Sequence, residues 1–218
     1  MLPEYRTIYR GGEDEIVEKK SRFIATVVPV NTEEEALEFV EKTRKKYWDA
    51  RHNCFAYIIG ERGQLQRCSD DGEPNGTAGK PMLDVLLGNE LRNVVTRYFG
   101  GTLLGTGGLV RAYSGAVKAG LDASVVITKI LGVKLHIETD YTTFGKIQYI
   151  LAQRELKILD TVYTDKVELE VLIPKTDVDQ VMHAITEGTN AQAEMTAGEE
   201  CYYAEIDGVP TILEENII

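Results

Sequence analysis

Two glycine-rich stretches of this 218-residue sequence contain residue types that bind anions or perform acid–base chemistry. The first, CSDDGEPNGTAGKP, occupies residues 68–81, and the second, TRYFGGTLLGTGGLVRAYSGA, occupies residues 96–116. Neither matches a standard nucleotide signature. A P-loop would need a lysine at Thr106, and a dinucleotide fingerprint would need a glycine at Val110.

The second stretch contains five glycines within nine residues, between a predicted strand and a predicted helix. These glycines are 100, 101, 105, 107 and 108. They allow positive φ and close approach of another molecule, and the free N–H groups of the helix start favour an anion. Arg97 and Arg111, on either side, could each add a charge-assisted contact to a phosphate. We therefore predict an anion site; the alternative is that the glycines serve turns and tight packing.

Aromatic residues accompany the glycines. Tyr98, Phe99 and Tyr113 are close enough in sequence to offer stacking faces to an exposed base. In the alternative interpretation these rings belong to the hydrophobic core.

The first stretch places three acidic residues, Asp70, Asp71 and Glu73, within four positions. Carboxylates this close could hold a hard cation. Asp-Gly and Glu-Pro are turn dipeptides, however, and the spacing is not that of a calcium loop, so a solvated turn is favoured. Thr77 and Lys80, beyond the turn, could join the anion site; Lys80 could equally be a solvent-exposed lysine.

His52 is the one histidine with a position that suits catalysis, since it precedes a predicted strand and could meet Asp70 or Cys54. A structural, hydrogen-bonded histidine is the commoner case, so we assign no catalytic residue and keep His52 as an accessory to the site. The three cysteines show no CxxC spacing and do not cluster with histidine, which predicts reduced thiols. We predict no metal and no cofactor.

The C-terminal part has a regular pattern. Alternating residues 133–138 predict a strand, and Asp140 caps a helix with apolar positions at Phe144, Ile147 and Leu151. Strands at 156–163 and 167–173, a helix opened by a capping box of Thr176 and Asp179, and a strand at 200–206 follow. The order β-α-β-β-α-β predicts a ferredoxin-like domain.

The N-terminal part is less regular. Strands are predicted at 23–28, 53–59, 64–68 and 93–98, with a short helix after Pro81 and a longer one over 109–123. A capping box of Thr32 and Glu35 predicts a further helix. Its inward residues are expected to be Ala36, Leu37, Val40 and Tyr47.

Charge divides the chain at nearly the same place. Residues 1–129 contain 18 basic and 18 acidic side chains, whereas residues 130–218 contain six and 17, which accounts for the net charge of −11. We therefore predict two domains, 1–131 and 132–218. Residues 44–118 contain 11 basic against seven acidic side chains, so an anionic partner would approach there. The absence of a signal-peptide pattern and of a long apolar run predicts a cytoplasmic protein with no membrane partner.

The strings ARHNCFAY (50–57), SDDGEPNGTAGKP (69–81) and RYFGGTLLGTGGLVRAY (97–113) closely resemble the signature of the Impact/YigZ family. The segment KSRFIATVVPV (20–30) matches the usual start of that family, and the acidic trailing domain matches one found in bacterial members. Asn75 and Leu103 depart from the common pattern; the second position often holds a lysine. The resemblance implies an α+β fold. Its first domain would be like a small-subunit ribosomal protein domain and elongation factor G domain IV, and its second like domain V of that factor.

The resemblance also implies a role in translation, since the eukaryotic relatives regulate it through protein contacts, but it supplies no catalytic residues. We expect a binding protein rather than an enzyme, with RNA or the ribosome as its partner. Two alternatives stay open: an enzyme acting on a small phosphorylated or nucleotide substrate, and a protein-interaction regulator that binds no nucleic acid. The expected binding surface comprises Asp71, Gly72, Glu73, Thr77, Lys80, Arg97, Tyr98, Gly100, Gly101, Gly105, Gly107, Gly108 and Arg111.

Overall fold

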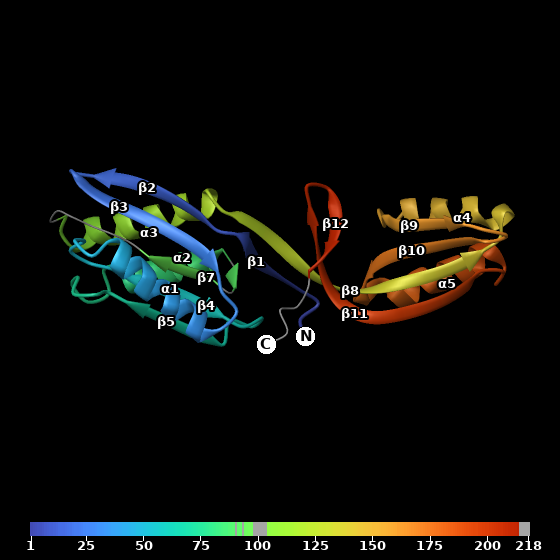
Figure 1. Cartoon of the computed structure of the whole chain (residues 1–218), viewed down its shortest axis with the longest axis horizontal. Coiled ribbons are helices and arrows are strands. Elements are labelled where there is room, and N and C mark those ends of the chain that lie inside the picture. Colours follow the sequence, from blue (N-terminus) through green and yellow to red (C-terminus); the bar gives the residue numbers. More distant parts are fainter. Residues whose placement is uncertain (90, 93, 98–103, 214–218) are drawn as a thin grey trace. The chain divides into compact units, whose positions relative to one another are not determined.

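The computed structural model describes residues 1–89, 91–92, 94–97 and 104–213. The chain forms two compact units (Figure 1). The N-terminal unit comprises residues 5–128, and the C-terminal unit comprises residue 129 onward together with residues 1–4. The division lies three residues before the boundary expected from charge and periodicity.

The N-terminal unit contains a five-stranded antiparallel sheet in the order β2-β3-β7-β4-β5. Its strands are β2 (Gly12–Glu18), β3 (Ser21–Pro29), β4 (Phe55–Ile59), β5 (Leu65–Ser69) and β7 (Val94–Arg97). Three helices cover the sheet: α1 (Glu33–Lys46), α2 (Gly79–Gly88) and α3 (Thr106–Asp122). Strand β1 (Glu4–Arg10) pairs in parallel with the short β6 (Leu91–Arg92) in a second sheet.

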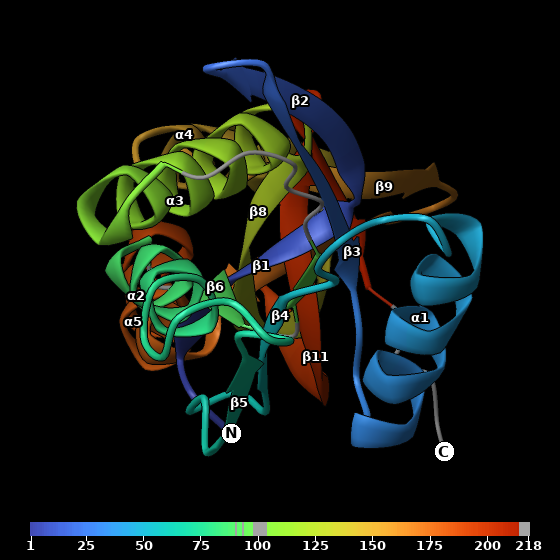
Figure 2. The same ribbon diagram turned by 90° about the vertical axis from the view of Figure 1, so that its left-hand side faces the viewer.

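Both faces of this sheet are buried, because successive side chains of a strand point to opposite faces. In β4, Ala56 and Ile58 belong to the core under α2 and α3, whereas Tyr57 and Ile59 pack with Val40 of α1. Figure 2 shows α1 on one side of the sheet and α2 and α3 on the other. The result is a three-layer unit with one hydrophobic core on each face.

The capping prediction for α1 is confirmed. The Thr32 hydroxyl accepts a hydrogen bond from the Glu35 N–H, and the Glu35 carboxylate accepts one from the Asn31 N–H. The inward prediction for Leu37 is wrong: its side chain is 47% exposed, whereas Ala36 and Val40 are buried. Ala36 and Val40 pack with Tyr57 and Ile59 in the core on this face of the sheet, whereas Leu37 lies outside that cluster.

Strand β2 was not predicted, because its sequence GEDEIVE is mostly polar and its side chains are mostly exposed. It pairs along its whole length with β3 through a two-residue turn in which Lys19 and Lys20 have φ values of 46° and 69°. Positive φ at both central residues is the conformation that the twist of a tight hairpin requires. Ile16 fixes the hairpin by packing against the core that includes α3.

The C-terminal unit has the predicted β-α-β-β-α-β order. Its elements are β8 (Val125–Thr139), α4 (Tyr141–Ala152), β9 (Ile158–Tyr163), β10 (Val167–Pro174), α5 (Val178–Thr189) and β11 (Glu194–Ile206). The strands pair antiparallel in the order β11-β8-β10-β9, and one core contains residues of both helices. The ferredoxin-like prediction is confirmed. A further strand, β12 (Val209–Ile212), pairs with the end of β11.

The two helix starts of this unit differ. The Asp140 carboxylate accepts hydrogen bonds from the Thr142 and Thr143 N–H groups, as predicted. The capping box of Thr176 and Asp179 is wrong, because a 3₁₀ turn (Lys175–Asp177) precedes α5 and the Thr176 hydroxyl donates to Asp177 instead. Within the described part of the chain, every helix is too short or too polar to cross a bilayer.

Candidate functional site

The sequence motifs meet at one end of the N-terminal sheet. Thr26, Arg97, Phe55 and Ser69 lie side by side on β3, β7, β4 and β5. Arg97 ends β7, and Ser69 opens the acidic loop of residues 69–79. Antiparallel pairing thus brings together three motifs that are far apart in the sequence.

The acidic loop is folded around the Asp70 side chain. The Asp70 carboxylate accepts hydrogen bonds from the N–H groups of Gly76, Ala78 and Gly79, at 2.8 to 2.9 Å. Two of these N–H groups, those of Ala78 and Gly79, lie at the start of α2, where the N-cap residue Ala78 has no capping side chain of its own. The Asp70 side chain, eight residues earlier in the sequence, therefore caps this helix. The turn interpretation of the acidic residues is thereby supported, with its backbone bonds between Glu73 and Asp70 and between Thr77 and Pro74.

Asp71 and Glu73 are also engaged by the protein. Asp71 accepts hydrogen bonds from Arg44 at 3.2 Å and from the Asn53 N–H at 2.5 Å. Glu73, whose side chain is only 9% exposed, accepts one from the Tyr113 hydroxyl at 2.9 Å. These two carboxylates were expected at the ligand surface; the structure instead places them in contacts that hold the loop to the fold.

Tyr113 lies in the core, with no exposed surface. Its ring meets Phe23 edge-on at 5.2 Å, and its hydroxyl lies 3.2 Å from the Cys54 sulfur. The stacking role expected for Tyr113 is therefore wrong, because a base cannot reach the ring. Its position on α3 directs it inward, between the helix and the sheet.

The buried network does not have the properties of a nucleophilic site. Burial raises the pKa of the Cys54 thiol to about 12, although the hydrogen bond with Tyr113 acts in the opposite direction. Burial also raises the pKa of Tyr113, and the neighbouring Cys54 and Glu73 add to the shift. Both groups are therefore protonated at neutral pH, and a catalytic cysteine would need a lowered pKa.

His52 joins the same network. Its Nδ1 lies 2.9 Å from the Asp71 carbonyl oxygen, which only accepts, so Nδ1 carries the proton. Its Nε2 lies 3.8 Å from a Glu73 carboxylate oxygen. The sequence prediction named Asp70 or Cys54 as partners; the observed ones are Asp71 and Glu73, in a structural arrangement.

The remaining loop residues are mostly engaged too. Thr77 is buried and its hydroxyl donates to the Pro74 carbonyl. Lys80 forms an exposed ion pair with Asp84 one helical turn later, at 2.5 Å. Gly72 has a φ of +86°, which explains the glycine at this turn. The loop therefore offers little to an anion except backbone.

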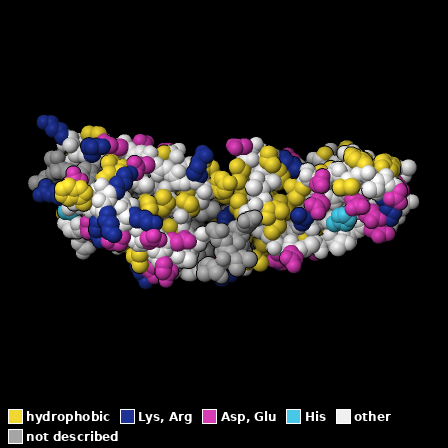
Figure 3. All heavy atoms as spheres, in the orientation of Figure 1, with side chains coloured by type: hydrophobic (Ala, Val, Ile, Leu, Met, Phe, Trp, Pro, Cys, Tyr) yellow, Lys and Arg dark blue, Asp and Glu magenta, His cyan; other side chains and the backbone are white. Residues whose placement is uncertain are grey.

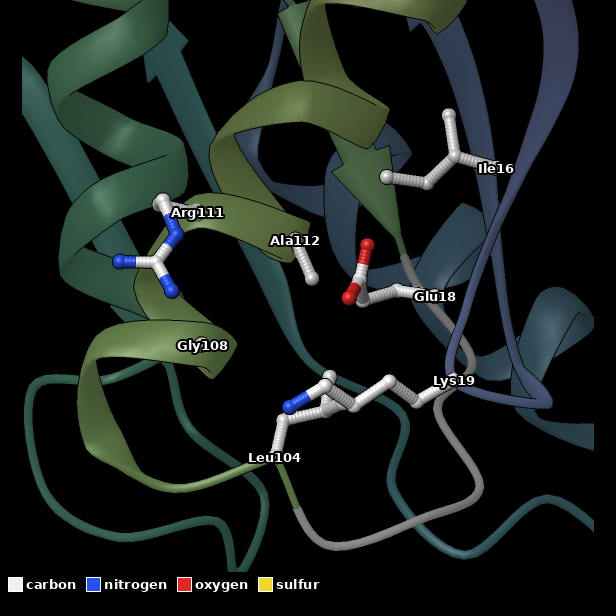
Figure 4. Close-up of a pocket in the computed structure, with 7 residues that line it drawn as sticks. All are labelled: Ile16, Glu18, Lys19, Leu104, Gly108, Arg111 and Ala112. Carbon is white, nitrogen blue, oxygen red and sulfur yellow. The ribbon is translucent and has the colours of Figure 1, made fainter.

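A different feature is open: a hollow of about 230 Å³ lies between the end of the β2–β3 hairpin and the start of α3 (Figure 4). Its lining contains three charged side chains, Glu18, Lys19 and Arg111. The rest of the lining is Ile16, Leu104, Gly108 and Ala112. Figure 4 shows Lys19 extending from the hairpin toward Leu104, while Arg111 projects from α3.

The two cations of the hollow are available to a ligand. Among the described residues neither Lys19 nor Arg111 forms an ion pair, and Arg111 is exposed. Glu18 supplies one negative charge, so the lining carries a net charge of about +1. Arg111 was predicted as an anion ligand; Lys19 was missed, because without β2 the turn that presents it could not be foreseen.

The start of α3 borders this hollow and has no side-chain cap. Gly105, the N-cap residue, has φ 73° and ψ 160°, a combination that only glycine adopts readily. A Cβ at Gly108 would lie 2.9 Å from the Leu104 Cβ, whereas one at Gly107 would only touch Arg111, at 3.7 Å. The start of α3 therefore presents three glycines, of which Gly105 and Gly107 are exposed, and it has no capping side chain on its N-cap residue for the first N–H groups of the helix.

Part of the predicted surface lies outside the described residues, namely Tyr98, Gly100 and Gly101, as does Phe99. Of Arg97 the backbone is described, at the end of β7. Across the ranges that are described, no three His, Cys, Asp or Glu residues are grouped so as to hold a metal ion.

Two family models match the sequence. Residues 19–121 match the Impact N-terminal domain, and residues 137–192 match a domain of unknown function, DUF1949. The first match contains the hairpin turn, β3, the acidic loop and all but the last residue of α3, and begins after β2; the second contains most of the ferredoxin-like unit.

Two bacterial relatives matched over most of their length, a partly matched mouse protein and a solved structure agree with these matches. The IMPACT family member YvyE of Bacillus subtilis is 43% identical over 93% of this chain and 94% of its own length. YigZ of Escherichia coli is 38% identical over 84% and 92%. The mouse Protein IMPACT is 37% identical over 41% of this chain and 30% of its own length. A crystal structure described as a hypothetical protein aligns with a TM-score of 0.57 at 32% identity, covering 91% of this chain and 99% of that one.

Proposed function

This chain belongs to the IMPACT family, and on that premise we propose that it is a translation-associated binding protein that contacts RNA, or the RNA of the ribosome. The contact surface is the hollow between the β2–β3 hairpin and α3. One observation carries the proposal: Lys19 and Arg111 line this hollow beside the bare N-terminus of α3. A partner of this kind would put the protein in the cytoplasm.

The chemistry of the hollow fits a phosphate. Two cations without ion-pair partners among the described residues, together with free N–H groups at a helix start, are the donors that phosphate oxygens accept from. The hollow is open and about 230 Å³ in volume, which admits a backbone phosphate of a polymer. Lysine and arginine side chains are frequent on the N-terminal unit in Figure 3, whereas acidic ones predominate on the C-terminal unit.

Binding is better supported than catalysis at this end of the sheet. The His52–Glu73–Tyr113–Cys54 network is mostly buried, its thiol has a pKa near 12, and its polar atoms bond to one another. An enzyme acting on a small phosphorylated substrate would need an acid or base beside the hollow, and Glu18 is the single carboxylate among the described residues that line it. The protein-interaction alternative remains an outcome of the test.

The test is a salt titration of RNA binding. A fluorescent single-stranded RNA of 12 nucleotides is titrated with the protein by anisotropy at several KCl concentrations. Each phosphate contact that a substitution removes should reduce the slope of log K against log salt by about 0.7. The slope should be smaller by about 0.7 in Arg111→Ala and by about 1.4 in the Lys19→Ala, Arg111→Ala double variant.

Arg154→Ala is the matched control, since Arg154 is an exposed arginine of the C-terminal unit. It should leave both slope and affinity unchanged. The proposal would be refuted if the protein did not bind RNA at low salt, or if the Lys19→Ala, Arg111→Ala double variant had the same affinity and salt slope as the wild type. Protein capture from nuclease-treated lysate that depends on the same pair would assign the surface to a protein partner.

A further inference from the structure

Trp48, the chain's single tryptophan, is one of the most exposed large apolar side chains in the protein: 82% of its surface is accessible to solvent. It follows α1 directly, in a turn closed by a hydrogen bond from the Ala50 N–H to the Tyr47 carbonyl at 2.9 Å. Tryptophan is highly buried on average, so an exposure of this size sets Trp48 apart.

The exposure of Trp48 does not come from a loose segment. The Tyr47 N–H bonds to the Thr43 carbonyl at 2.9 Å, and the Tyr47 hydroxyl lies 3.4 Å from Glu13. Arg44 is bonded to Asp71, and Lys46 to Glu13. The residues around Trp48 therefore attach the turn to the sheet and to the acidic loop, while the indole ring is left outside on a fixed support.

Two cations, three positions before and three positions after Trp48 in the sequence, are available to a ligand. Lys45 and Arg51 are exposed, and within the described part of the chain neither takes part in an ion pair. The neighbouring Arg44 and Lys46 are, by contrast, paired with carboxylates. Asp49, which is exposed, is the acidic residue of the turn, so the three free charges sum to about +1.

The turn lies on the side of the sheet where β7 ends at Arg97 and the acidic loop begins. Lys46 is bonded to Glu13, which is paired across the sheet with Thr26, and Thr26 is paired with Arg97 at the end of β7. Trp48 therefore belongs to the end of the N-terminal unit from which the chain continues toward α3. Figure 2 shows α1 on the face of the sheet opposite α3. A single RNA strand that contacted both Trp48 and the start of α3 would therefore have to pass from one face of the sheet to the other.

We propose that Trp48, Lys45 and Arg51 form a second subsite for single-stranded RNA, in which the indole stacks on an unpaired base and the two cations contact the adjoining phosphates. Indole rings stack on any base, and arginine and lysine neutralise the backbone without reading sequence. In a duplex the faces of the bases are already stacked, so the subsite selects unpaired RNA. The inference rests on the proposed function and specifies its ligand.

Because Trp48 is the sole tryptophan, its fluorescence reports on this subsite alone. The wild-type protein is titrated with a 12-nucleotide oligouridylate and with a 12-base-pair RNA duplex at 50 mM KCl. Emission should be quenched by the single strand and not by the duplex. In parallel anisotropy measurements, Trp48→Ala should weaken single-strand binding roughly 5- to 100-fold, and Trp48→Phe should restore part of it.

Tyr149→Ala is the matched control, because Tyr149 is an exposed aromatic residue, 65% accessible, on α4 of the C-terminal unit. It should bind like the wild type. Lys45→Ala with Arg51→Ala should lower the salt slope by about 1.4 while quenching persists at saturation. Since Trp48 is exposed, its variants should melt at the wild-type temperature.

The outcomes separate this inference from the function it rests on. Anisotropy that shows binding dependent on Arg111, with no quenching and no effect of Trp48→Ala, refutes the subsite and leaves the proposed function standing. Equal quenching by duplex and single strand refutes the selectivity. Absence of binding at 50 mM KCl and below refutes both.

Discussion

The acidic loop of residues 69–79 and the hollow beside α3 belong to one unit but use their charged groups differently. In the loop, each carboxylate of Asp70, Asp71 and Glu73 accepts hydrogen bonds from the protein itself. In the hollow, Lys19 and Arg111 have no ion-pair partner among the described residues. A buried polar group without a hydrogen-bond partner destabilises the fold, so the partly buried carboxylates of the loop are hydrogen-bonded within the protein. Exposed cations such as Lys19 and Arg111 are solvated and can bind a ligand instead.

The same contrast exists between the two units. Residues 130–218 carry the net charge of −11, and alternate residues of β8 and β10 place Glu138, Glu168 and Glu170 on the sheet face away from α4 and α5. Under the proposed function, a polyanion would be repelled from that face and would bind at the hollow of the N-terminal unit. The comparison leads to three predictions beyond the binding tests, given from the largest expected effect to the smallest.

The largest effect is expected from Asp70→Ala. Three backbone N–H groups lose their acceptor, so the free energy of unfolding should fall by about 2–4 kcal/mol. Urea denaturation measures the loss. Asp84→Ala, which removes an exposed pair with Lys80, is the control and should change stability by less than about 0.5 kcal/mol.

The same variant tests whether the acidic loop has a structural role and the hollow a binding role. Folded Asp70→Ala protein should bind single-stranded RNA as the wild type does, because its carboxylate is used within the loop. Loss of affinity with unchanged stability would reverse our assignment and place Asp70 at the ligand.

A smaller effect is expected at the start of α3. Gly105→Ala puts a side chain on a backbone with φ 73° and ψ 160°, which should destabilise the protein by about 1–3 kcal/mol. Gly88→Ala, at the end of α2, meets no atom within 4 Å and lacks a positive φ, so it should be nearly neutral. Thermal denaturation of the two variants gives the comparison; equal effects would show that the helix start is not held in this conformation.

The smallest effect is expected from the titration of the Cys54 thiol, which leaves the free energy of unfolding unchanged at neutral pH and alters it only at alkaline pH. Its thiol has a pKa of about 12 in the folded protein and about 8.5 when unfolded, so the fold holds the proton more tightly. The resulting stability is complete below about pH 8.5 and decreases as pH rises toward 12. Wild-type protein should therefore lose stability faster than Cys54→Ala above pH 9, as measured by urea denaturation.

Thiol labelling gives an independent measure of the same group. In a Cys68→Ser, Cys201→Ser background, the buried Cys54 should react at pH 8 only as fast as the protein unfolds. Fast labelling of the native protein would contradict both the burial and the raised pKa.

Much of the fold follows from local sequence patterns. The alternation of Val133, Leu135 and Ile137 and the Asp140 cap depend on neighbours within a few positions, and these predictions are confirmed. Strand β2 could not be predicted in this way, because GEDEIVE is stabilised by pairing with β3 and by Ile16 packing rather than by its own periodicity. The error at Leu37 has a related origin: helical spacing gives an apolar stripe but not the width of the contact.

The candidate site shows the same difference between what local sequence patterns predict and what long-range contacts decide. By itself the sequence determined that anion-binding residue types are concentrated between residues 68 and 111 and that the net negative charge comes from residues 130–218. Only the tertiary structure decided which of those residues are buried or hydrogen-bonded within the protein and which are exposed. Tyr113 reaches Cys54 and Glu73 across separations of 59 and 40 residues, and Lys19 reaches the hollow through an unforeseen hairpin. Residue types and spacing fix what chemistry is available, whereas burial and hydrogen bonding between distant segments fix which groups remain free to use it.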